Sequence, residues 1–462
     1  MGRQVRSRLA LLTVAGVLAT AGPAWPPAAA ATPKWNSPAR FDGSCPPAED
    51  AADAAGPADF RRRAHHAAHP HRKPTRPTRV ATFGNGLMAA GQSNGATFHD
   101  QTIRMVAHTS VSGALPRVRL SNLYGSSPLT VGAVDLARQS ATAGAAGTAV
   151  DGTHRTVTFD GAGTVTIPAG QDVLSDPVPM DVDADQDLLV SVYLPESPAG
   201  ADTWHQRALD TTWISATGNH VADDGTDNYP ATSRQWFVLA GLDVASPTAT
   251  GTLVAVGDSI TDGVGSTPGA NRRWPDDLAR RLGASDGGAT RGVVDTGIGS
   301  NRILTDAGTD GFNKSLISRF RHDVLSRPHV KDVVLLEGIN DIGDNIGPDG
   351  TGPLTATELE DGLLDVICQA HAAGVRITGG TILPFQGAKY YTSYGEQIRE
   401  AVNRWILTSG AFDDVIDFDR ALRNPDNPLT LDPAYDSGDH LHPNDAGYQA
   451  MADSVDLGAF LP

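Results

Sequence analysis

The sequence of 462 residues contains little cysteine and fewer basic than acidic residues. Its two cysteines, Cys45 and Cys368, are too few for a disulfide framework. A bridge between them is compatible with the sequence but not required by it, and the apolar helical pattern around Cys368 favours a small buried thiol. The formal net charge of −17 argues against nonspecific nucleic-acid binding, which needs clustered Lys and Arg.

Long hydrophobic runs are absent too. The most apolar run, residues 9–18, is too short to span a bilayer as a helix. It follows several arginines and precedes the small residues 28–31, an order typical of a cleaved secretory signal peptide over residues 1–31. An uncleaved membrane anchor is the alternative. We expect a secreted, soluble protein without a transmembrane segment.

Residues 32–79 are rich in Pro, Ala, Arg and His and show no apolar periodicity, which indicates a linker or a processed pro-segment. The histidines between His65 and His71 could suggest a metal or polyanion site. They lack carboxylate or cysteine partners at ligand-like spacing, so no metal and no cofactor is predicted.

Residues 80–247 carry many short alternating stretches with turn residues between them, such as 102–107. The stretches 156–159 and 164–167 flank Asp160-Gly161-Ala162-Gly163, which predicts a β-hairpin. No strong helical run occurs here. The pattern predicts an all-β sandwich domain, jelly-roll-like in topology.

From residue 248 to 462 apolar strands alternate with amphipathic helices. A helix is predicted from about Thr357 to Gly374, and Asn444 is placed to cap the final helix. The predicted strands are 253–256, 293–294, 332–336, 375–378 and 415–416. This alternation predicts an α/β domain with a doubly wound parallel sheet covered by helices.

Polar stretches follow the carboxyl ends of these strands, where open α/β sheets bind ligands. Ser259 follows the first strand, and residues 295–302 and 337–341 follow the second and third. Residues 439–444 come near the carboxyl terminus. If the sheet is parallel, all of them collect along one rim. A rim with a serine, glycine-rich backbone, an asparagine and an Asp/His pair contains the parts for acyl transfer.

The chemistry assigns a role to each part. A serine hydroxyl such as that of Ser259 needs an imidazole to take its proton, and the imidazole needs a carboxylate on its far nitrogen. His442 and Asp439 are three residues apart and suit these roles. His440 competes as the base, but it is adjacent to Asp439, a spacing that seldom lets two side chains meet. No metal pair is indicated.

The oxyanion of a tetrahedral intermediate needs hydrogen-bond donors already in place. The side chain of Asn340 and the backbone N–H groups of Ser259 and Ser300 can supply them. Asn340 could instead form a simple Asx turn. We expect structural hydrogen bonding from the flanking Asp258 and Asp341.

Three motifs resemble the first, third and fifth blocks of the SGNH (GDSL) hydrolases: Gly-Asp-Ser-Ile at 257–260, Gly-Ile-Asn-Asp at 338–341 and Asp-His-Leu-His at 439–442. The resemblance implies a flavodoxin-like three-layer fold and the family's roles for Ser259, Asn340, Asp439 and His442. At the family's second block, Ser300 stands where a glycine is usual. Its backbone N–H can still donate.

The first domain resembles the β-sandwich that precedes this module in secreted actinobacterial-type SGNH proteins. Residues 118–125 carry this resemblance, which is weaker than that of the three motifs. The expected function is that of a secreted serine esterase acting on small-molecule or polysaccharide esters, with the deacylation of glycans as one form of this activity. A lipase, a glycosidase-like enzyme and a glycan-binding protein on a hydrolase fold are the alternatives. Trp204 and Trp213 could be stacking platforms for glycan or core aromatics.

Overall fold

The computed structural model describes Cys45 and residues 77–90, 97–196, 203–285, 290–308, 313–348 and 352–461. The predicted signal peptide and nearly all of the predicted linker, with its histidines, lie outside these residues. Cys45 and the other described residues belong to one compact unit. None of the helices in the described part of the chain is long and apolar enough to cross a membrane.

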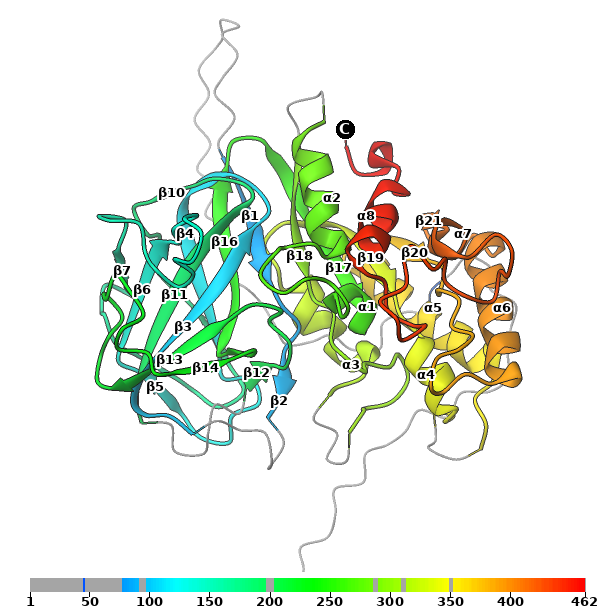
Figure 1. Cartoon of the computed structure of the whole chain (residues 1–462), viewed down its shortest axis with the longest axis horizontal. Helices are drawn as coiled ribbons and strands as arrows, with labels where there is room; N and C mark the ends of the chain where they lie inside the picture. Colours follow the sequence, from blue (N-terminus) through cyan, green and yellow to red (C-terminus); the bar gives the residue numbers. More distant parts are fainter. Residues whose placement is uncertain are drawn as a thin grey trace, which may run out of the picture. The chain divides into compact units, whose positions relative to one another are not determined.

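The first part of the described chain consists of antiparallel sheets (Figure 1). Its strands are β1 (Thr78–Gly84), β2 (Met88–Ala89), β3 (His99–Thr109), β4 (Gly113–Ser121), β5 (Leu129–Val131), β6 (Ala133–Arg138), β7 (Arg155–Val157), β8 (Val165–Ile167), β9 (Asp172–Leu174), β10 (Asp181–Val182), β11 (Gln186–Glu196), β12 (Thr203–His205), β13 (Thr212–Thr217), β14 (Ala231–Ser233), β15 (Trp236–Phe237) and β16 (Leu239–Ser246).

Two larger sheets dominate, with the orders β1-β16-β4-β10 (β9 beside β4) and β14-β13-β3-β11-β6-β7. Apolar side chains from both, including Met105, Val118 and Val190, form one core. The predicted β-rich region is therefore present. Its jelly-roll topology stays a prediction.

The predicted hairpin around residues 160–163 is wrong. The turn itself forms, because Phe159 and Ala162 make an isolated antiparallel bridge. Beyond it the two strands diverge, since β7 pairs with β6 whereas β8 pairs with β5 in another sheet. Glycine-rich turns predict a reversal of the chain, but they do not choose the strand partners, and Val157 pairs with Val134 whereas Ile167 pairs with Leu129.

The second part contains a parallel sheet of β17 (Ala249–Gly257), β18 (Thr290–Asp295), β19 (Val330–Leu336), β20 (Arg376–Gly380) and β21 (Asp414–Ile416). The spatial order is β18-β17-β19-β20-β21, which is the flavodoxin-type order 2-1-3-4-5. The prediction of an α/β domain with a parallel sheet is confirmed.

Helices connect and cover these strands (Figure 1). They are α1 (Ser259–Asp262), α2 (Trp274–Gly283), α3 (Leu316–Phe320) with the π-turn Arg321–Leu325, α4 (Ile339–Asp344), α5 (Ala356–Ala372), α6 (Ser393–Thr408), α7 (Phe418–Leu422) and α8 (Asp445–Asp453). Contacts join α2 and α7 to α8 in one group, and α3 and α6 to α5 in another. Right-handed crossovers place such groups on opposite faces of the sheet.

Local sequence accounts for the ends of these elements. Thr355 and Glu358 form a capping box at the start of α5, and the side chain of Asn444 accepts hydrogen bonds at the start of α8, as predicted. At the end of β17, a Cβ on Gly257 would lie 2.1 Å from the carbonyl oxygen of Leu336. Only glycine allows β17 and β19 to approach this closely at the rim.

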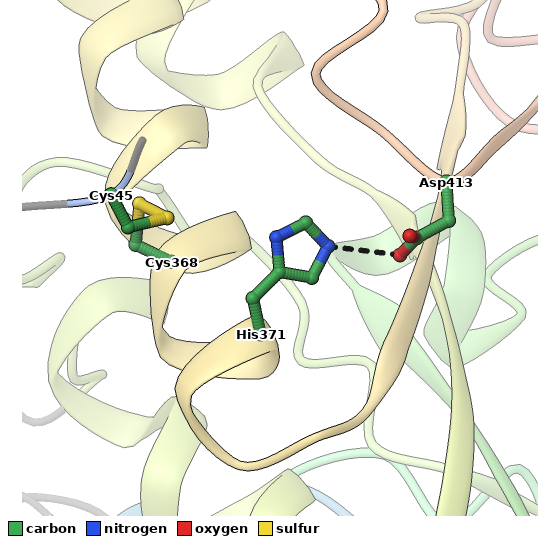
Figure 2. Close-up of a disulfide and its surroundings, with 4 residues drawn as sticks. All are labelled: Cys45, Cys368, His371 and Asp413. Atoms are coloured by element: carbon green, nitrogen blue, oxygen red, sulfur yellow. Dashed lines mark hydrogen bonds and ion pairs between the residues drawn. A yellow bond between two sulfur atoms is a disulfide. The ribbon is translucent and has the colours of Figure 1, made fainter. Parts of the chain in front are cut away.

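A disulfide joins Cys45 to Cys368 on α5 (Figure 2). The prediction of a small buried thiol at Cys368 is therefore wrong, since the residue is half-buried and bonded to Cys45. The apolar face of α5 uses neighbouring positions, among them Ile367 and Ala370. One turn on, Nε2 of His371 lies 3.0 Å from Oδ2 of Asp413, which connects the end of α5 to the segment before β21.

Removing this disulfide should destabilise the protein. Cys368→Ser should lower the free energy of unfolding by about 2–4 kcal/mol, because the crosslink restricts the unfolded chain. Chemical denaturation under non-reducing conditions measures the change. Cys45→Ser and the double variant should match Cys368→Ser, since all three lack the same bond. Additive losses in the double variant would show that the effect does not come from the bond.

Candidate active site

Ser259 lies at the carboxyl end of β17, as the first residue of α1. Asp258 caps this helix by accepting a hydrogen bond from the backbone N–H of Ile260. The helix has four residues, all buried, and ends at Gly263 in the left-handed region. Ser259 itself is 8% exposed. The strand-turn-helix thus fixes the backbone of Ser259 while its side chain reaches the rim.

The loop before α8 brings a histidine and a carboxylate to this serine. Oγ of Ser259 lies 2.8 Å from Nε2 of His442, and Nδ1 of His442 lies 2.6 Å from Oδ2 of Asp439. The other carboxylate oxygen of Asp439 accepts the backbone N–H groups of Leu441 and His442. The loop therefore holds Asp439 and His442 in a fixed relation, and the structure brings all three predicted residues together.

His440, the competing base, has a different partner. Its Nδ1 lies 2.6 Å from Oδ2 of Asp436, and its side chain is 55% exposed. The backbone of His440 adopts φ +64°, in the left-handed region that non-glycine residues rarely occupy. Asp436 was not singled out in the sequence, because only the fold brings it beside His440.

The other predicted donors lie on the neighbouring segments. Ser300 is exposed and has φ +60°, the left-handed conformation that a glycine would adopt freely. In the described part of the chain, its backbone N–H and that of Ser259 have no hydrogen-bond acceptor. The side chain of Asn340, at the start of α4, donates one N–H to the carbonyl of Asn301, next to Ser300.

The loop that carries Ser300 is packed between α1 and α4. A Cβ on Gly297 would lie 2.3 Å from the backbone nitrogen of Asp262, so the loop touches α1 directly. On the other side, the carboxylate of Asp341 accepts the backbone N–H groups of Ile303 and Leu304. The expected structural role of Asp341 is visible in these bonds. The backbone segments of Ser259, Ser300 and Asn340 are thereby held side by side.

Electrostatics differ between the rim and the layer beneath it. Partial burial opposes ionisation of Asp439, but its hydrogen bonds with His442 lower its pKa below the usual range. Below the rim, burial raises the pKa of Asp258 to about 7 and that of Asp341 to about 6. Burial also raises the pKa of Glu337 well above its usual value. Asp439 is therefore the ionised carboxylate beside His442 at neutral pH.

Sequence reasoning missed Arg319, which lies on α3 and is 2% exposed. Its guanidinium donates to the carbonyls of Gly257 and Thr296 at 2.9 and 2.7 Å, and to Oδ1 of Asn301 at 2.7 Å. It also pairs with Asp323 at 3.2 Å. One buried cation thus connects the ends of β17 and β18 to the loop of Ser300. An arginine in an amphipathic helix gives no sequence signal of such a role.

Other features lie apart from this site. A cavity of about 320 Å³ is lined by residues of both parts of the chain, including Trp236, Arg273 and Asp295, but by none of the predicted site residues. Within the described ranges, no group of three or more His, Cys, Asp or Glu residues is placed to hold a metal ion. Trp204 and Trp213 are 4% and 7% exposed, so they are core aromatics and not stacking platforms.

Comparison with known families agrees with this geometry. Residues 255–450 match the model of the GDSL-like Lipase/Acylhydrolase family. The chain carries a GDSL-like lipase/acylhydrolase domain. This domain is accordingly a carboxylic ester hydrolase, and the resemblance seen in the three sequence motifs is confirmed.

Solved structures similar to this domain include a putative lipolytic protein of the G-D-S-L family from Desulfitobacterium hafniense, with 22% identity and TM-score 0.33 over 44% of this chain and 96% of that one. The acetyl xylan esterase AlAXEase has 23% identity and TM-score 0.35, over 46% and 100%. An acetylxylan esterase from Geobacillus stearothermophilus has 21% identity and TM-score 0.33, over 45% and 93%. No curated protein matches the sequence.

Replacing Arg319 should affect both stability and activity. Arg319→Met should lower the free energy of unfolding by about 3–5 kcal/mol, because it removes the buried cation that pairs with the carboxyl groups of Asp323 and Glu337. It should also lower the kcat for ester hydrolysis at least about tenfold, because the loops that it connects can shift. Urea unfolding and ester kinetics measure the two effects.

Arg399 offers a matched control. It is equally buried, pairs with Glu396 and Asp419, and lies on α6 away from Ser259. Arg399→Met should destabilise the protein similarly and leave the kcat of the folded fraction unchanged. An equal loss of kcat in both variants would contradict a specific role for Arg319.

Proposed function

We propose that the protein is a secreted serine esterase that hydrolyses short-chain carboxylic esters through Ser259, His442 and Asp439. The observation that carries this proposal is the continuous chain of contacts from Oγ of Ser259 to Nε2 of His442, and from Nδ1 of His442 to Asp439. Nucleophilic acyl transfer requires this arrangement, in which a histidine lies between the serine hydroxyl and a carboxylate. The family match supports the reaction class.

In the first half of the proposed reaction, Oγ of Ser259 attacks the ester carbonyl carbon while Nε2 of His442 accepts the hydroxyl proton. The imidazolium that forms keeps its Nδ1–H directed at the ionised carboxylate of Asp439, 2.6 Å away. His442 then delivers the proton to the leaving alcohol, and an acyl-serine remains. His442 then takes a proton from water, which attacks the acyl carbon. As the acyl–serine bond breaks, His442 returns the proton to Oγ of Ser259 and the acid is released.

The tetrahedral intermediates carry a negative oxygen that needs donors. We assign this role to the backbone N–H groups of Ser259 and Ser300 and to the side-chain amide of Asn340. Two observations support the assignment. The two backbone groups lack acceptors in the described part of the chain, and Asn340 uses one N–H to hold Asn301, which leaves its second N–H for the substrate.

The surroundings favour a short acyl group. The exposed side chains beside Asp439 and His442 are polar, among them Ser437 and His440, and Ser300 is exposed on the neighbouring loop. A long acyl chain would need an apolar surface to leave water. A polar rim suits a small acyl group on a polar alcohol, such as an acetyl group on a glycan.

Secretion is part of the proposal. The basic and apolar pattern of residues 1–31 indicates a signal peptide. The bond between Cys45 and Cys368 supports an oxidising compartment, where disulfides form and persist. Expression with the native amino terminus, followed by assay of the medium, tests this part separately from catalysis.

Replacing the nucleophile should abolish turnover. Ser259→Ala should lower the kcat for p-nitrophenyl acetate at least about a thousandfold, because the three residues act as a unit. Wild-type activity should fall from acetate through butyrate to laurate, and acetylated xylan should release acetate. Initial rates with the purified full chain measure these effects.

Ser266→Ala is the matched control, since Ser266 is also buried but its hydroxyl donates to the carbonyl of Gly263. It should keep wild-type rates. Full activity of Ser259→Ala would overturn the assignment of the nucleophile. Preference for laurate would indicate a lipase, and a wild type inactive on every ester would indicate a glycosidic substrate or a binding protein.

A further inference from the structure

His205 of the β-rich region is buried against the helix that presents Ser259. It ends β12, and its Nε2 lies 3.0 Å from Oδ1 of Asp262 on α1. The side chains of His205 and Asp262 are 2% and 3% exposed. Asp262 follows Ser259 by three residues on the same short helix. A residue far away in sequence therefore binds the nucleophile's own helix.

Hydrogen-bond geometry fixes the charge of His205. Its Nδ1 lies 2.7 Å from the carbonyl oxygen of Gly86, and its Nε2 faces the carbonyl of Arg207 as well as Asp262. All of these partners are acceptors, so both ring nitrogens must carry protons. A buried imidazolium paired with a buried carboxylate results. Burial opposes this charge, but Asp262 outweighs it and raises the pKa of His205.

The same region also holds the loop of Ser300. Ile298 on this loop is fully buried and belongs to the hydrophobic core of the β-rich region. A Cβ on Gly86, the partner of His205, would lie 2.5 Å from Cγ1 of Ile298. Two of the segments that carry the proposed active site are thus anchored outside the parallel sheet.

We propose that His205 is a positioning residue of the active site, whose imidazolium holds Asp262 and so fixes α1 with Ser259 in the reactive geometry. This inference rests on the proposed esterase function. The β-rich region then forms part of the active site and is not a detachable module. His205 does not touch substrate, so its loss should lower kcat and leave KM nearly unchanged.

The proposal predicts a pH dependence. Because the folded protein binds the proton of His205 more tightly than the unfolded chain, the clamp is complete below the ordinary histidine pKa of about 6.5. The ion pair between His205 and Asp262 is lost as pH rises through the higher pKa that His205 has in the folded protein. The titratable and charged groups around the pair include Arg273 at the start of α2, Arg207 near Oδ2 of Asp262, and the carboxyls of Asp258 and Asp295, whose pKa values burial raises to about 7. The kcat of the wild type should therefore decline on the alkaline side.

The test compares the pH profiles of kcat and KM for p-nitrophenyl acetate in the full chain. His205→Gln should lower kcat at least about tenfold, with little change in KM, and should lack the alkaline decline. The double variant His205→Gln/Asp262→Asn removes the uncompensated carboxylate. It should recover stability relative to His205→Gln without restoring the wild-type pH profile.

His108 provides a matched control. It is a partly buried histidine whose ring nitrogens face Asp187 and Asp185 at 2.8 and 3.1 Å, away from α1. His108→Gln should cost stability and leave the kcat profile unchanged. If His205→Gln keeps the wild-type kcat and alkaline decline, the inference is wrong although the esterase stands. If the wild type hydrolyses no ester, the proposed function fails and this inference fails with it.

Discussion

The buried guanidinium of Arg319 is the interaction on which the rest of the site depends. A parallel sheet only delivers strand ends to a common rim, and the segments beyond those ends still need fixed positions. Arg319 binds the carbonyls of Gly257 and Thr296 and the side chain of Asn301 at once. These three groups precede or flank Ser259 and Ser300. One cation therefore holds the segments of Ser259, the proposed nucleophile, and Ser300, a proposed oxyanion donor, in a fixed relation.

The β-rich region adds a second set of constraints to the same segments. His205 binds Asp262 on α1, and Ile298 inserts into the core of the antiparallel sheets. The geometry of the proposed active site is therefore constrained from two sides, by Arg319 within the α/β domain and by His205 and the core of the β-rich region. Burying these polar groups is costly unless each finds a partner. The contacts of Arg319 with Gly257 and of His205 with Asp262 provide such partners between segments distant in sequence.

Much of the α/β fold could be predicted because its signals are local. Apolar strands, the capping residue Asn444 and the three motifs around Ser259, Asn340 and His442 all lie within short stretches of sequence. The order of the motifs along a β-α alternation was enough to predict that they meet at one rim. The parallel sheet confirms the predicted α/β fold, and the family match of residues 255–450 confirms the predicted reaction class.

Long-range pairing could not be predicted in the same way. The diverging strands β7 and β8, the bond between Cys45 and Cys368, and the pairing of His440 with Asp436 all depend on tertiary contacts. Arg319 and His205 carry no motif. Their roles follow only from which oxygen atoms surround them after folding, a property that periodicity and composition do not encode.

The most direct test of the account is covalent labelling of the native full chain with a fluorophosphonate probe. The serine oxygen attacks phosphorus and fluoride leaves, which requires a hydroxyl activated by a neighbouring base. Intact mass should show one adduct per protein, and peptide mapping should place it on Ser259. A His442→Ala variant should label at least about a hundredfold more slowly. Labelling at another residue, or no labelling of the folded wild type, would contradict the central claim that Ser259 is an activated nucleophile.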